Sequence, residues 1–132
     1  MAKRKFIDMT GQRFGYEKRK WGEFYTIKED AGYKVKILII LPKEMLSLQL
    51  HNKRSENWVI LEGNPSIYLG DDVNNETGCW FEHKPQDTII VAKQQWHRIA
   101  NNTDKEVVIL ETQFGKCEES DIIRRDDKYG RV

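Results

Sequence analysis

The fold is decided by the stretch from Leu46 to Gly63, which reads LSLQLHNKRSENWVILEG. Its first part alternates, so that Leu46, Leu48 and Leu50 fall on one face of an extended strand and polar residues fall on the other. Its last part is a continuous apolar run, as in a strand that is covered on both faces. A short polar segment with one histidine, two cations and one glutamate separates the two parts. The pattern predicts two β-strands joined by a polar turn.

The same short-strand pattern continues along the chain. Segments rich in β-branched and aromatic residues are separated by Gly, Pro, Asn or Asp, which favour turns. These segments are YKVKILIIL (33–41), SIYLG (66–70), TGCWFEH (77–83), DTIIVA (87–92), HRIANN (97–102) and VVILETQF (107–114). The sequence therefore predicts an all-β domain, arranged as a sandwich, a barrel or a jelly roll. We expect GDDVNNETG (70–78) to form a long hairpin loop, and only the tail (118–132) is compatible with a helical turn.

Composition narrows the class of protein. A chain of 132 residues has the size of one domain. Lysine and arginine total 22 against 21 acidic residues, so the overall charge indicates neither nucleic acid nor a membrane surface as a partner. Neither end carries a long apolar segment, which favours a cytoplasmic location. The two cysteines, Cys79 and Cys117, lack the spacing of a disulfide framework or a zinc ribbon.

The polar face of the first strand admits two interpretations. Ser47, Gln49, His51 and Lys53 share that face by strand parity. In most half-buried antiparallel strands such a face meets solvent, while the leucines form the core. In a small barrel it can instead line an internal ligand cavity, with the other face covered by neighbouring strands or a second subunit. Periodicity alone permits both.

Five segments of the chain, in the right order, resemble one protein family: RKWGEFYTI, AGYKVKILII, LSLQLHNKRSENWVILEG, QQWHRIANNT and ESDIIRRDDKYGR. They are similar to the C-terminal cupin domain of bifunctional mannose-6-phosphate isomerase/mannose-1-phosphate guanylyltransferases and to small stand-alone cupins. The resemblance implies a cupin double-stranded β-helix, a jelly-roll barrel, over residues 17–132. Residues 1–16 would then form an N-terminal arm. The guanylyltransferase half has no counterpart in this chain, and no Gly-rich phosphate loop is present in the sequence.

The resemblance also implies a metal site. Cupins of this kind use an H-x-H-x-x-E motif and one later histidine, which correspond here to His51, Lys53, Glu56 and His97. Lysine stands where the second histidine is expected, and an ammonium offers no lone pair to a cation. The remaining metal ligands would be His51, Glu56 and His97, a set that suits Zn²⁺, Mn²⁺ or Ni²⁺.

The activity implied by the resemblance is the interconversion of mannose 6-phosphate and fructose 6-phosphate. Such a reaction needs a base, an electrophile and cations for the phosphate. Glu56, Lys53 and His97 are the expected catalytic residues. The expected substrate-binding residues are Gln49, Arg54, Arg98, Arg19 and Arg124.

Two alternatives remain open from the sequence. One is a catalytically silent cupin that binds a sugar phosphate or a nucleotide sugar, and the other is a sugar epimerase with the same fold. Because exposed sheet edges and outer apolar faces favour association, we also expect a homodimer.

Overall fold

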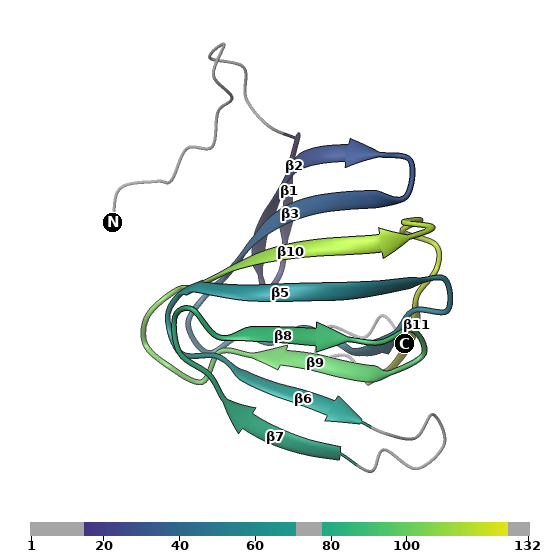
Figure 1. Ribbon diagram of the computed structural model, residues 1–132. Helices are drawn as coiled ribbons and strands as arrows, with labels where there is room; N and C mark the ends of the chain where they lie inside the picture. The colour runs from purple at the N-terminus through teal and green to yellow at the C-terminus, as the bar shows by residue number, and fades with distance from the viewer. Residues whose placement is uncertain (1–14, 71–77, 127–132) are drawn as a thin grey trace.

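Eleven β-strands form two antiparallel sheets that face each other in the computed structural model of the protein (Figure 1), which describes residues 15–70 and 78–126. The strands are β1 (Gly15–Arg19), β2 (Gly22–Asp30), β3 (Tyr33–Ile40), β4 (Leu48–Leu50), β5 (Arg54–Glu62), β6 (Ser66–Gly70), β7 (Gly78–Glu82), β8 (Thr88–Val91), β9 (Trp96–Ala100), β10 (Val107–Gly115) and β11 (Ile123–Asp126). One sheet has the order β1-β2-β3-β10-β5-β8, and the other has the order β11-β4-β9-β6-β7.

The core fills the space between the sheets. Its main cluster draws apolar side chains from both of them, among them Trp58 and Ile60 of β5, Ile67 of β6 and Ile99 of β9. Burial of such side chains removes apolar surface from water, which is the dominant favourable term in folding. A smaller cluster, formed by Leu48, Leu50, Tyr68 and Trp96, covers the outer face of the five-stranded sheet.

The inner face of the six-stranded sheet changes from apolar to polar along its strands. Residues opposite each other in adjacent strands share a face, so the register defines rows across the sheet. One row is Leu38, Ile109 and Ile60. The next is Lys36, Glu111 and Trp58, and the third is Lys34, Gln113 and Glu56. One end of the barrel is therefore apolar, and the other carries buried charges.

The all-β prediction is confirmed, and each predicted segment within the described residues forms a strand or part of one. Two features differ from the expectation. The N-terminal hairpin β1–β2 was not predicted, and it extends the sheet into residues assigned to the arm. The tail forms strand β11 on β4 and no helical turn between residues 118 and 126. Residues 71–77 of the predicted hairpin loop lie outside the described part of the chain. No helix long and apolar enough to cross a membrane occurs within residues 15–70 and 78–126.

Candidate functional site

The turn between β4 and β5 directs the polar residues of the opening stretch to different places. Regular alternation ends at Leu50, and a bend at residues 52 and 53 precedes β5, which begins at Arg54. His51 and Arg54 are buried as a result, 4% and 6% exposed, whereas Lys53 is exposed. The expectation that Lys53 shares the cavity wall with His51 is wrong, because strand parity does not carry through the bend.

Three buried side chains from three parts of the barrel converge beyond this turn. His51 follows β4, Glu56 lies on β5 and His97 lies on β9, and one ligand-type atom from each falls within 4.8 Å of the others. The rings of His51 and His97 are tilted against each other with centroids 5.2 Å apart. The expected meeting of these residues inside the barrel is what the structure shows.

Hydrogen bonds fix the tautomers of both histidines. The side chain of Arg54 can only donate, so His51 Nε2, 3.1 Å from Arg54 Nη2, is the acceptor. His51 Nδ1 therefore carries the proton and donates to the carbonyl of Asp121. His97 Nδ1 lies 2.9 Å from the carbonyl of Gln95 and can only donate to it. Both Nε2 atoms are consequently left with a lone pair.

Electrostatics keep both rings neutral. Burial, and next the Arg54 guanidinium, lower the pKa of His51 to about 4. Burial likewise lowers the pKa of His97 to about 4. At neutral pH the two imidazoles are therefore uncharged donors of electron pairs.

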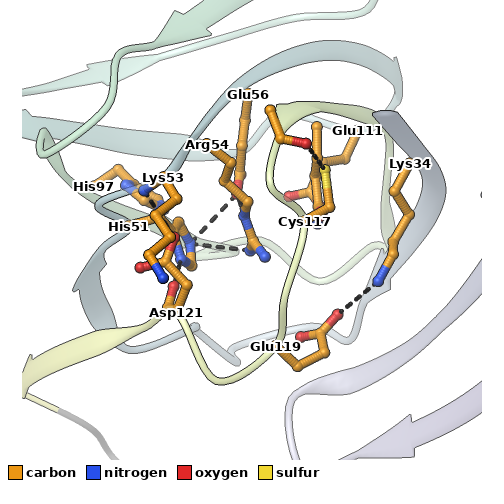
Figure 2. A network of polar contacts seen from close by, with 12 residues as sticks. Lys34, His51, Lys53, Arg54, Glu56, His97, Glu111, Cys117, Glu119 and Asp121 are labelled. Atoms are coloured by element: carbon orange, nitrogen blue, oxygen red, sulfur yellow. Dashed lines mark hydrogen bonds and ion pairs between the residues drawn. The ribbon is translucent and has the colours of Figure 1, made fainter. Parts of the chain in front are cut away.

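Arg54 places its own positive charge among these donor atoms (Figure 2). Its Nε donates to Glu56 Oε2 at 3.0 Å, and its Nη2 donates to His51 Nε2. The other carboxylate oxygen, Glu56 Oε1, accepts from the indole N–H of Trp58 at 3.0 Å. A buried carboxylate is thereby fully hydrogen-bonded, as its burial requires.

The donor set suits a first-row divalent metal in type, since it offers two neutral imidazoles and a carboxylate. Backbone carbonyls hold both Nδ1–H groups, as is common for histidines that bind metals. The guanidinium of Arg54, however, already occupies the lone pairs of His51 and Glu56. A metal and Arg54 therefore compete for the same atoms, and the residues fit a metal when Arg54 turns away.

A cavity of about 90 Å³ adjoins this cluster. Four cationic residues line it, namely Arg19, Lys36, Arg54 and Arg124. Two carboxylates and three uncharged polar side chains complete its polar lining: Glu111, Glu119, Ser47, Gln49 and Gln113. Ser47 and Gln49 of the polar face thus line a cavity, as the second interpretation of this strand expected, while Gln49 stays partly exposed.

Four of the five predicted substrate-binding residues line this cavity, namely Gln49, Arg54, Arg19 and Arg124. Arg98 is not among the lining residues, and its Nε donates to the carbonyl of Leu46 at 2.8 Å.

Sequence reasoning missed Lys36, Glu111 and Gln113. Strand parity could have found the last two, because Ile109, Glu111 and Gln113 share one face and Ile109 is a core position. Burial, and next the neighbouring Glu56 carboxylate, raise the pKa of Glu111 to about 7.

Comparison with known proteins identifies the family of the chain. The family model described as "Mannose-6-phosphate isomerase C-terminal" matches residues 10–127. The chain belongs to this family. It is 30% identical over 115 residues to the mannose-1-phosphate guanylyltransferase ManC of Salmonella typhimurium, covering 86% of this chain and 22% of ManC. It is 32% identical over 112 residues to mannose-1-phosphate guanylyltransferase 2 of Escherichia coli O157:H7, covering 84% of this chain and 22% of that enzyme. The chain thus spans less than a quarter of the length of these relatives.

Solved structures establish the fold as the cupin double-stranded β-helix. The capsular polysaccharide assembling protein CapF of Staphylococcus aureus superimposes with a TM-score of 0.77 at 16% identity, covering 90% of this chain and 36% of CapF. The Schizosaccharomyces pombe Cnp3 cupin domain gives a TM-score of 0.61 at 17% identity, covering 71% of this chain and 64% of that chain. The predicted jelly-roll fold is therefore confirmed.

Proposed function

We propose that this cupin domain binds a phosphorylated sugar in the cavity and interconverts its aldose and ketose forms, as the family description suggests for mannose 6-phosphate. The observation that carries the proposal is the position of the neutral His51 and His97 next to Glu56, beside a cavity lined by four cationic side chains. The cations suit a phosphate, and Ser47, Gln49 and Gln113 offer hydrogen bonds to sugar hydroxyls.

Isomerisation moves a proton between C1 and C2 of the sugar, so it needs a base and a positive charge near the developing enediolate. Glu56 is expected from the sequence as a catalytic residue, but both of its oxygens already accept hydrogen bonds. Two carboxyl groups line the cavity. Glu119 is paired with Lys36, whereas Glu111 is held by Gln113 Nε2 at 2.9 Å and has its pKa raised to about 7, close to the pH at which it would exchange a proton. We assign the proton transfer to Glu111.

The positive charge has two possible sources. A Zn²⁺, Mn²⁺ or Ni²⁺ ion held by His51, Glu56 and His97 would polarise the sugar oxygens as a Lewis acid. The guanidinium of Arg54 reaches the same donor atoms and supplies a fixed positive charge of its own. Lys53, which was expected in this role, is exposed.

The test is a coupled assay that follows fructose 6-phosphate formed from mannose 6-phosphate, with protein purified without metal and then supplied with Zn²⁺, Mn²⁺ or Ni²⁺. We expect turnover in at least one of these conditions and a loss of about 100-fold or more in kcat for Glu111→Gln, with binding retained. Turnover by Glu111→Gln at the wild-type rate would remove Glu111 from the mechanism. No turnover under any condition would contradict the isomerase proposal.

A second function is favoured by Arg54 itself. Because its guanidinium holds two of the three donor atoms, the domain has a cation in the site without any metal. A domain that binds a sugar phosphate without converting it would need no more than this. Calorimetric binding of mannose 6-phosphate in the absence of turnover would support this second function.

A further inference from the structure

Two lysines of β3 point into the barrel beside the cavity. Lys34 and Lys36 are only 7% and 5% exposed. Lysine is rarely buried to this degree without an anion, because removing an ammonium from water is costly. The Nζ atom of Lys36 contacts Glu119 Oε1 at 2.6 Å. The Nζ atom of Lys34 lies 3.5 Å from the same oxygen, as Figure 2 shows. Lys34 also lies 3.5 Å from Glu29.

The carboxylate that both lysines contact comes from a segment between two strands and not from a strand of the sheet. Glu119 belongs to residues 116–122, the segment between β10 and β11 that we call the strap. Its side chain is 59% exposed. Burial alone would raise the pKa of Glu119. The positive charges of Lys36, Arg54 and Lys34, of which Lys36 contributes most, instead lower it to about 2. A carboxylate that solvent can reach therefore neutralises two buried cations.

The cavity also contains a buried acceptor without a partner. Gln113 is 1% exposed, and its Nε2 donates to Glu111. Its Oε1 has no hydrogen-bond partner among the described residues. Buried polar atoms nearly always have a partner, so this oxygen is suited to a donor that arrives with a ligand. Lys36 and Gln113 line the same cavity.

We propose that the Glu119 carboxylate holds the place of a ligand phosphate, which displaces it and binds to Lys36 with Lys34 beside it, while a ligand hydroxyl donates to Gln113 Oε1. The choice of a phosphorylated sugar rests on the proposed function. The inference goes further because it locates the phosphate and identifies the side chain that competes with it. Arg54 and Arg19 line the same cavity and add positive charge for a dianion.

Calorimetry with three probes tests the proposal: inorganic phosphate, mannose 6-phosphate and uncharged mannose. The variant Glu119→Gln keeps the shape of the side chain and removes the competing charge. We expect it to bind phosphate and mannose 6-phosphate about tenfold more tightly than wild type, with no gain for mannose. Glu118→Gln is the matched control, because the Glu118 carboxylate pairs with the exposed Lys116 at 3.4 Å. Its affinities should stay within about twofold of wild type.

A gain in affinity cannot arise from misfolding, so Glu119→Gln is the decisive variant, and loss of binding in Lys36→Met would add support. Equal phosphate affinity in wild type, Glu119→Gln and Glu118→Gln would overturn the inference. Turnover of mannose 6-phosphate with an unchanged KM in Glu119→Gln would also overturn it and leave the isomerase proposal intact. Tighter phosphate binding in Glu119→Gln without turnover would support the inference and contradict the isomerase proposal.

Discussion

Arg54 is the residue of the site that most directly opposes metal binding, because it donates to two atoms that a metal would need. Its replacement by methionine removes the competing charge and keeps a similar length of apolar side chain. We expect Arg54→Met to bind Zn²⁺ and Mn²⁺ at least about tenfold more tightly than wild type, a change of about 1.4 kcal/mol. Calorimetric titration of protein freed of metal measures this directly.

Lys53→Met is the control for this prediction, since it removes a neighbouring cation that is exposed. If Arg54 is the cation that opposes a metal, the Lys53 variant should match wild type within about twofold. Tighter metal binding in Lys53→Met, with no change in Arg54→Met, would contradict the assignment.

The difference between Lys53 and Arg54 also shows how far the sequence can define a site. The convergence of His51, Glu56 and His97 followed from the resemblance to a family and from strand parity. The inward direction of Arg54 did not, because the bend at residues 52 and 53 resets the alternation and the sequence pattern does not fix where β5 begins. Lys34 and Lys36 were similarly hidden, since a lysine alternating with apolar residues usually faces solvent.

The strap lies beside the cavity, and two of its residues, Glu119 and Ile122, line it. Asp121 accepts hydrogen bonds from the backbone N–H groups of Asn52 and Lys53 at 3.0 and 2.8 Å, so the strap is fixed to the β4–β5 turn. Gly115 precedes it with a φ of 111°, and an added Cβ there would lie 2.5 Å from the Lys53 carbonyl oxygen. Only glycine allows the chain to leave β10 this close to the turn.

The ion pair of the strap predicts a pH dependence. The pKa of Glu119 falls from 4.5 to about 2 on folding, so the pair stabilises the native state above pH 4.5, and this stabilisation is lost as the pH falls toward 2. We expect wild type to exceed Glu119→Gln in free energy of unfolding by about 1 kcal/mol at neutral pH, because solvent screens a half-exposed pair. Urea denaturation at a series of pH values should show this difference shrinking below about pH 4.5. A difference that stays constant down to pH 3 would contradict the ion-pair assignment.

At the level of elements, the sequence identified the strands with clear alternation or a continuous apolar run and missed those with neither pattern. β10 and β5 pair over eight positions at the centre of their sheet, and their apolar runs identified both. The hairpin β1–β2 escaped notice because it lies at a sheet edge, where charged residues replace the alternation. For β11 the sequence permits either a solvated terminal strand or a turn, because its residues, IRRD, carry three charges in four positions.

At the scale of the whole molecule, the inner face of the six-stranded sheet changes from apolar to polar along the barrel. The row of Leu38, Ile109 and Ile60 belongs to the apolar core, although Leu38 also reaches the cavity, whereas the next two rows contribute Lys36, Glu111 and Gln113 to the cavity lining. Buried charges are costly, and a fold tolerates them where they are hydrogen-bonded and serve a site. The burial of apolar side chains at one end thus offsets the free-energy cost of burying charges at the other.

The outer surface is where association between copies is expected. β7 is the last strand of the five-stranded sheet (Figure 1). All five of its residues are exposed. Trp80 and Phe81 on this strand are 49% and 61% exposed. An edge strand with exposed aromatic side chains is an open site for pairing with another chain. We therefore expect the homodimer predicted from the sequence to form through β7.

Analytical ultracentrifugation at micromolar concentration measures this, with a dimer appearing at twice the 15.6 kDa of one chain. Phe81→Asp should weaken the dimer by about 2 kcal/mol or more, because a charge would be buried at the centre of the contact. Ile123→Asp is the matched control, since Ile123 is 47% exposed on β11 at the opposite edge of the same sheet. Equal weakening by both variants would place the contact elsewhere, and a monomeric wild type would remove the dimer while leaving the cavity, which lies within one chain, unaffected.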